Sequence, residues 1–121
     1  MEKQSKNYVC GLCFNRIEDC TCDVAPWELI GIDYEIQYAV RTLNAKGYIT
    51  HMSCAGHYNG KNNPVQGYIT LRDAIPTTPM GWTQRTYTRR LDYFFVPKNK
   101  TEYKQMLKEK IDALNEWVDT L

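Results

Sequence analysis

Apolar residues recur every three or four positions in two stretches of the chain, and this period predicts a helix in each. The first covers residues 33–47, with Asp33 as the expected N-cap and Gly47 as the expected C-terminal stop. The second begins near Thr101 and runs to the end of the chain, with Lys and Glu opposite its apolar stripe. That stripe comprises Tyr103, Met106, Leu107, Ile111, Leu114, Trp117, Val118 and Leu121.

Segments rich in β-branched and aromatic residues predict strands between the two helices. Residues 48–54 and 67–72 are expected to pair as a hairpin with a long polar tip, and residues 85–96 to add one or two strands. This order predicts an α+β fold, with a small antiparallel or mixed sheet of three to four strands and two helices packed on one face. We expect an N-terminal zinc knuckle at residues 1–25 and the α+β domain at residues 26–121.

Composition limits the classes of function. A chain of 121 residues with 43% hydrophobic residues and a formal net charge of +1 is typical of one small globular domain. No apolar run approaches the roughly 20 residues that a membrane span needs, and residues 1–7 do not resemble a signal peptide. We therefore expect a cytoplasmic protein with no membrane partner. The near-neutral charge leaves nucleic acid possible but not favoured as a partner.

Four of the five cysteines lie close together near the N-terminus, in the sequence "CGLCFNRIEDCTC". In a reducing compartment, a CxxC followed by a CxC indicates metal binding rather than disulfides. Four thiolates form a closed tetrahedral zinc site, which is structural and leaves no position for chemistry. We predict a structural Zn²⁺ held by Cys10, Cys13, Cys20 and Cys22.

A second candidate site is the segment "SCAGH", which ends the strand predicted at residues 48–54. Gly56 permits a left-handed bend that points successive N–H groups into a concavity suited to an anion. Ser53 adds a hydroxyl donor and His57 a ring donor. We predict that Ser53, Cys54, Gly56 and His57 bind a small anion; a simple turn with a buried, inert Cys54 is the alternative.

Two other kinds of chemistry rank lower for this segment. A catalytic pair of Cys54 and His57 would place nucleophile and base in one turn, where they rarely align with an oxyanion site. A metal site formed by Cys54, His57 and His51 lacks a carboxylate nearby in the sequence.

Arginines and aromatic residues after residue 80 suggest a ring-bearing anionic ligand. Arg85 and Arg89 have guanidinium groups that suit a phosphate or carboxylate, and Trp82 offers a surface for a base. We therefore add Trp82, Arg85 and Arg89 to the predicted ligand-binding residues, and expect a nucleotide-like or other phosphorylated small molecule.

Residues 32–121 resemble a group of small proteins from Gram-positive bacteria and their phages. These proteins share the pattern "NxKGYxTxxSCxGH", a strand similar to "YIxF", then "PxGW" and a terminal helix ending near "WVxxL". The "SCxG" core is also similar to the "SSCSGR" loop of the wybutosine-synthesis methyltransferase family, with His57 in place of its arginine. The residues that match the first group are Leu43, Asn44, Lys46, Gly47, Tyr48, Thr50, Ser53, Cys54, Gly56, His57, Tyr68, Ile69, Pro79, Gly81, Trp82, Trp117 and Val118.

Two classes of function follow from these patterns. In the first, the protein binds a nucleotide-like molecule through the SCAGH loop; the resemblance implies a phage accessory factor that sequesters a host signalling nucleotide. In the second, the knuckle is an interaction module that contacts RNA or protein, and the loop is structural.

Overall fold

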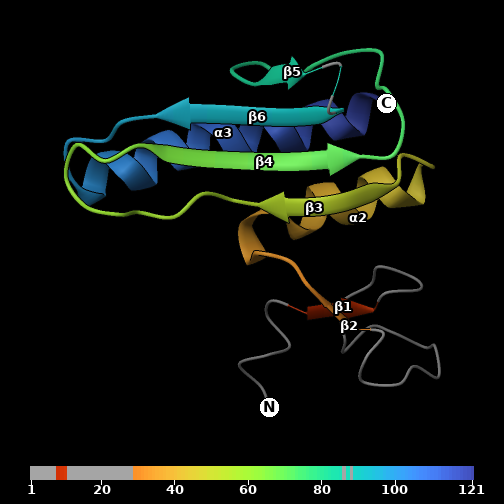
Figure 1. Cartoon of the computed structure of the whole chain (residues 1–121), viewed down its shortest axis with the longest axis horizontal. Helices are drawn as coiled ribbons and strands as arrows, with labels where there is room; N and C mark the ends of the chain where they lie inside the picture. The colour runs from red at the N-terminus through yellow and green to blue at the C-terminus, as the bar shows by residue number, and fades with distance from the viewer. Residues whose placement is uncertain (1–7, 11–28, 86, 88) are drawn as a thin grey trace.

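Four antiparallel strands form the main sheet of the computed structural model (Figure 1). The structure describes residues 8–10, 29–85, 87 and 89–121. The strands are β3 (Thr50–Cys54), β4 (Val65–Leu71), β5 (Thr83–Arg85) and β6 (Arg90–Phe95). They lie in the order β3-β4-β6-β5, so β3 and β5 are the edge strands. The predicted α+β class is confirmed, and the main sheet is entirely antiparallel.

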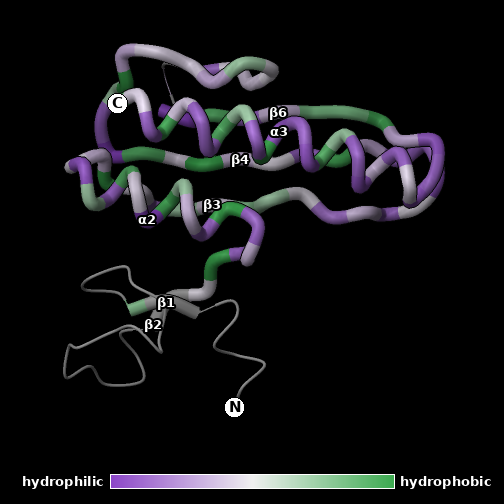
Figure 2. The backbone as a smooth tube through the Cα atoms, turned by 180° about the vertical axis from the view of Figure 1, so that it is seen from behind, coloured by the Kyte–Doolittle hydropathy of each residue, from purple (hydrophilic) through white to green (hydrophobic). Residues whose placement is uncertain are grey.

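Two helices cover one face of this sheet (Figures 1 and 2). A 3₁₀ turn, η3 (Tyr34–Ile36), leads directly into α2 (Gln37–Ala45), and α3 (Lys100–Thr120) follows β6. Gly47 follows α2 with a φ of 92°, so the predicted glycine stop is confirmed. The side chain of Asn99 accepts a hydrogen bond from the Glu102 N–H at 2.8 Å and caps the start of α3.

The core lies between the sheet and the helices. Along β4 buried and more exposed positions alternate, as expected of a strand with one face on a core. Figure 2 shows hydrophilic and hydrophobic stretches along both helices, as expected of helices with one face on the core. Four of the eight residues of the predicted α3 stripe are buried, and the other four are partly buried and pack against the core. The buried four are Leu107, Leu114, Trp117 and Val118, and the partly buried four are Tyr103, Met106, Ile111 and Leu121.

The other face of the sheet carries no helix among the described residues. Figure 1 views the molecule from this side, with α2 and α3 behind the strands. Three cross-strand pairs of β4 and β6 lie on this open face, because they alternate with the pairs that face the core. These pairs are Gln66 with Phe94, Tyr68 with Asp92, and Thr70 with Arg90.

A separate two-stranded sheet lies N-terminal to the main one. Its strands, β1 (Tyr8–Cys10) and β2 (Leu29–Gly31), pair antiparallel, so residues on both sides of the boundary expected near residue 25 are joined. Cys10 is buried, whereas Cys13, Cys20 and Cys22 lie outside the described residues, so the zinc knuckle stays a prediction. In the part of the chain that the structure describes, no helix has an apolar stretch sufficient to cross a bilayer.

Candidate metal centre

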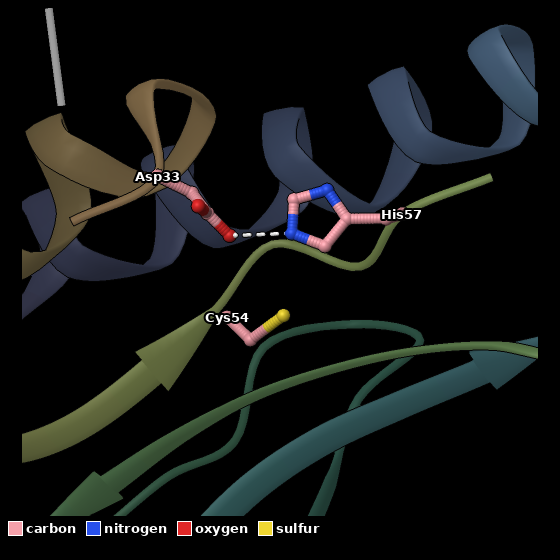
Figure 3. A group of neighbouring side chains, drawn as sticks. All are labelled: Asp33, Cys54 and His57. Atoms are coloured by element: carbon pink, nitrogen blue, oxygen red, sulfur yellow. Dashed lines mark ion pairs between the residues drawn. The ribbon is translucent and has the colours of Figure 1, made fainter. Parts of the chain in front are cut away.

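Three side chains with metal-ligating atoms converge beside the SCAGH loop: Asp33, Cys54 and His57 (Figure 3). One such atom from each lies within 4.8 Å of the other two. The Asp33 Oδ2 and His57 Nε2 atoms form an ion pair at 3.2 Å. His57 is the most accessible member, with its side chain 69% exposed, and Asp33 and Cys54 are partly buried. The group therefore opens toward solvent on the imidazole side.

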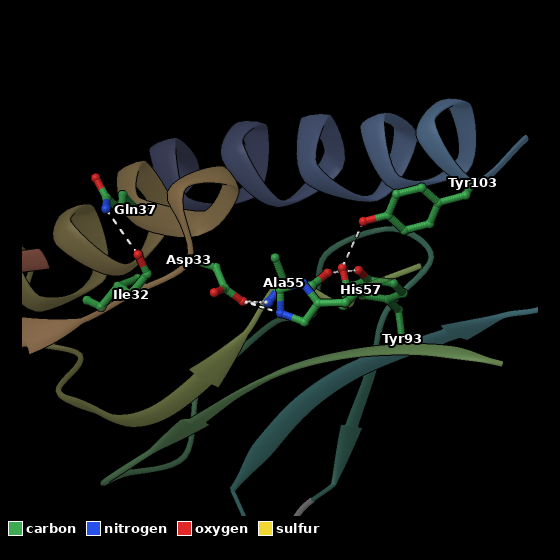
Figure 4. A network of polar contacts seen from close by, with 8 residues as sticks. Ile32, Asp33, Gln37, Ala55, His57, Tyr93 and Tyr103 are labelled. Carbon is green, nitrogen blue, oxygen red and sulfur yellow. Dashed lines mark hydrogen bonds and ion pairs between the residues drawn. The ribbon is translucent and has the colours of Figure 1, made fainter. Parts of the chain in front are cut away.

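Asp33 reaches this group because its side chain turns away from the helix that it precedes. It occupies the predicted N-cap position, but its carboxylate accepts no hydrogen bond from the first turn of η3. Its Oδ2 atom instead accepts the Ala55 N–H at 2.8 Å (Figure 4). A carboxylate that accepts a backbone N–H is held in one orientation, so Asp33 is preorganised against the loop.

Two tyrosines fix the loop from the core side (Figure 4). The Tyr93 hydroxyl donates to the Ala55 carbonyl, and the Tyr103 hydroxyl donates to the Gly56 carbonyl at 3.1 Å. Gly56 has a φ of 91°, and a Cβ atom built there would lie 2.6 Å from the Tyr93 hydroxyl oxygen. Glycine is thus required at this position by both backbone conformation and space.

The charges around the loop are negative. Burial raises the pKa of the Cys54 thiol, the charges of Asp33 and Glu35 raise it further, and a hydrogen bond with the Gly56 backbone partly opposes them. The pKa of Tyr93 is also raised, mainly by burial, with contributions from the same two carboxylates. A negative environment favours a bound cation over a bound anion.

The structure separates the predicted ligand-binding residues into different regions. Ser53 pairs with Ile69 in the sheet and lines a small groove of about 260 Å³ along the β3 edge, with His51 and Met52 among its neighbours. Trp82 is only 7% exposed, and its ring nitrogen donates to the Lys110 carbonyl at 3.1 Å. It is a core residue, and no ligand can stack on its ring there.

Neither predicted arginine lies at the loop. Arg85 is on the edge strand β5, and its Nε donates to Asp92 at 3.0 Å. Cys54 lies on the opposite edge strand, β3, with β4 and β6 between them. Arg89 precedes β6 in a turn, and its Nη1 donates to the Arg72 carbonyl at 3.3 Å. That turn adjoins the beginning of β3, whereas Cys54 ends the strand.

Asp33 is the member of the group that sequence reasoning assigned only to a cap. It lies 22 positions before Ala55 in the chain, so no local spacing connects it to the loop. A short polar residue before a helix indicates a cap by default, because capping is its commonest role. The folded chain brings the start of η3 beside the end of β3, and Asp33 then supplies the carboxylate that a metal site at Cys54 and His57 lacked in the sequence.

Comparisons of this chain with protein-family models, curated proteins and solved structures find no match. The resemblance to phage and Gram-positive proteins therefore stays a prediction.

Proposed function

We propose that this protein binds a divalent transition-metal ion, such as Zn²⁺, through Asp33, Cys54 and His57. The convergence of a carboxylate, a thiol and an imidazole on one point carries the proposal. These are ligand types that zinc takes in proteins. Three protein ligands leave a fourth position for water or another molecule, which is the arrangement in which zinc polarises what it binds.

The distances suit such an ion. Zinc holds oxygen and nitrogen ligands at about 2.0–2.1 Å, so in a tetrahedral site the two ligand atoms lie about 3.3 Å apart. The Asp33 Oδ2 and His57 Nε2 atoms are 3.2 Å apart. The Cys54 sulfur, within 4.8 Å of both, would have to approach by about an ångström at most.

A nucleophilic thiol relay is the main alternative chemistry, and the ring orientation argues against it. In a Cys-His-Asp relay the carboxylate binds one imidazole nitrogen and the thiol binds the other. Here Asp33 pairs with Nε2, and Figure 3 shows Nδ1 on the side of the ring away from Cys54. Both side chains therefore approach the same nitrogen, as ligands around a shared ion do.

Anion binding by the loop itself is less well supported than cation binding. The Ala55 N–H donates to Asp33, and the Gly56 backbone hydrogen-bonds Cys54, so these donors have partners within the chain. An incoming phosphate would also meet the Asp33 charge. A phosphorylated ligand at this loop, and the sequestration of a host signalling nucleotide that the resemblance implies, stay predictions.

The four clustered cysteines are proposed to hold a second, structural Zn²⁺. Cysteine ligands in two sites require a compartment that keeps thiols reduced, so a cytoplasmic location is part of the same proposal. Elemental analysis of the reduced full-length protein is expected to give two zinc ions per chain.

A zinc titration in a defined background tests the Asp33–Cys54–His57 site by itself. With Cys10, Cys13, Cys20 and Cys22 replaced by serine, Cys54 is the only thiol of the chain. Isothermal titration calorimetry of this variant is expected to show one zinc ion bound per chain.

Single substitutions in that background identify the ligands. Asp33→Asn and His57→Ala should each weaken zinc binding at least tenfold, because each removes a bond to the metal. His51→Ala is the matched control, since His51 is the only other histidine and is not part of the group. Unchanged zinc affinity in both Asp33→Asn and His57→Ala would refute the proposed site.

A further inference from the structure

The open face of the sheet contains a polar hollow that the metal proposal does not involve. It has a volume of about 300 Å³ and is lined by Gln66, Arg85, Arg90 and Asp92. These residues come from β4, β5 and β6; in Figure 1 β4 and β6 lie in front of α3, and β5 lies at the edge of the sheet. None of them belongs to the group at Asp33, so the two sites can be tested separately.

Asp92 holds two guanidinium groups in this hollow. Its side chain is nearly buried and accepts from Arg85 through Nε at 3.0 Å and Nη2 at 3.5 Å. The Arg90 Nε lies 3.4 Å from the same carboxylate, and the Arg90 guanidinium stacks 4.3 Å from the centre of the Tyr68 ring. The bond to Asp92 also raises the pKa of Arg85, because it stabilises the charged guanidinium.

The pair of guanidiniums retains donors for a ligand. A guanidinium carries its N–H donors in a planar fork, and two of them offer more donors than one carboxylate accepts. Two positive charges against the one negative charge of Asp92 leave the hollow with a net charge of +1. Planar forks of this kind suit an oxoanion with several acceptor oxygens, of which phosphate is the main biological example.

An exposed aromatic ring lies beside the hollow. Phe94 is 63% exposed, although large apolar side chains on a sheet are usually covered. It follows Asp92 by two residues on the same face, a separation of about 7 Å along a strand. Its cross-strand partner is Gln66, whose amide also lines the hollow. A flat apolar ring at this distance from a phosphate-binding group provides a stacking surface for a nucleobase.

We propose that this hollow binds a nucleotide, with the phosphate between Arg85 and Arg90 and the base on Phe94. The nucleotide can be free or part of a single-stranded nucleic acid, because both present a phosphate and a base across one ribose. Gln66 lines the hollow and pairs across the strands with Phe94, so its amide can bond the ribose or the base edge.

Two probes distinguish these sources: adenosine monophosphate and a single-stranded oligoadenylate of ten nucleotides. Binding of both is measured on the full-length protein, by amide chemical-shift titration for the mononucleotide and by fluorescence anisotropy for a labelled oligonucleotide. Similar affinities identify a free-nucleotide site. A much tighter oligonucleotide whose binding weakens steeply with salt identifies a strand-binding surface.

Arg85→Ala and Phe94→Ala are each expected to weaken binding of the better probe roughly tenfold, through loss of a charge-assisted bond or of base stacking. Lys108→Ala is the matched control, because Lys108 is also an exposed cation paired with a carboxylate, that of Asp112, but on α3. It should change the affinity by less than about twofold, as expected of a single charge on the opposite face.

The chemical-shift titration of the unaltered protein locates the binding site without any substitution, so it tests the proposal even if a variant folds poorly. The side-chain amide of Gln66 and the backbone amide of Phe94 should show the largest shifts. Absence of binding by both probes, largest shifts elsewhere in the molecule, or folded Arg85→Ala and Phe94→Ala variants with unchanged affinity would overturn the proposal.

Discussion

Replacing Gly56 by alanine is expected to destabilise the protein far more than the same change at Gly47. The two glycines have almost the same positive φ, 91° at Gly56 and 92° at Gly47. An L-residue in the left-handed region costs about 1–2 kcal/mol of folding free energy, and this cost is common to both sites. Replacing glycine by alanine also restricts the unfolded chain, which stabilises the folded protein by about 0.4–1 kcal/mol, and this gain is common to both sites.

The surroundings of the two glycines differ. A Cβ atom at Gly47 would have no heavy atom within 4 Å, whereas at Gly56 it would lie 2.6 Å from the Tyr93 oxygen and 2.9 Å from a Val65 methyl carbon. Tyr93 cannot move easily, because it bonds the Ala55 carbonyl and packs with aromatic rings on both sides. Overpacking of this kind costs about 1–3 kcal/mol.

The free energy of unfolding, measured by urea denaturation followed by circular dichroism, should therefore fall by about 1–3 kcal/mol more in Gly56→Ala than in Gly47→Ala. Because both glycines have a positive φ of nearly the same size, the difference chiefly reports packing at Gly56. Equal losses, within about 0.5 kcal/mol, would show that the loop does not pack against Tyr93 and Val65 as described.

Three further changes test the fold and its electrostatics. Leu114→Ala removes a fully buried side chain of α3 and should cost about 2–5 kcal/mol in urea denaturation; a neutral result would mean that the helix is peripheral. Asn99→Ala loses the bond to the Glu102 N–H and should lower stability by about 0.5–2 kcal/mol, whereas Asn99→Asp should retain most of it. Tyr93→Phe should cost about 1–3 kcal/mol by leaving the Ala55 carbonyl without its donor. Burial raises the pKa of Tyr93, so its contribution is present below the unfolded value of about 10 and is lost as the pH rises through the folded value. Stability should thus fall less steeply above about pH 10 in Tyr93→Phe than in the parent, and identical slopes would refute this assignment.

Most of the fold could be predicted from the sequence because its signals are local. The three- and four-residue period of α3 identifies Leu107, Leu114 and Val118 as buried, and the structure buries all three. The glycine after α2 ends that helix as its position suggests. Such features depend on neighbouring residues in the chain, and tertiary packing then reinforces them.

The candidate site was only partly predictable. Cys54 and His57 are noticeable because they lie three residues apart after a strand, but Asp33 joins them only through tertiary packing. Asp33 changes the ligand that the loop is expected to bind. The loop sequence alone suggested an anion, whereas a carboxylate beside the thiol and the imidazole favours a cation.

Burial explains why the predictions for Trp82 and Gly56 were incomplete. Trp82 was expected to stack on a ligand, but sequence cannot distinguish an aromatic residue on a surface from one in a core, and Trp82 is in the core. Gly56 was expected to shape a ligand cradle, whereas it is also the point where the loop contacts Tyr93. A bulky residue there would disturb packing as well as binding, so Gly56 variants cannot report on ligand binding alone.

The visible absorption spectrum of the Co²⁺-loaded protein tests the proposed metal site most directly. The measurement uses the chain in which Cys54 is the only thiol, and cobalt takes the place of zinc as a spectroscopic probe. A site formed by Asp33, Cys54 and His57 should give the intense visible bands of four-coordinate cobalt together with a sulfur charge-transfer band in the near ultraviolet. Cys54→Ser should remove the charge-transfer band, and Asp33→Asn should weaken cobalt binding. A weak spectrum identical to that of hydrated cobalt would contradict metal binding at this site.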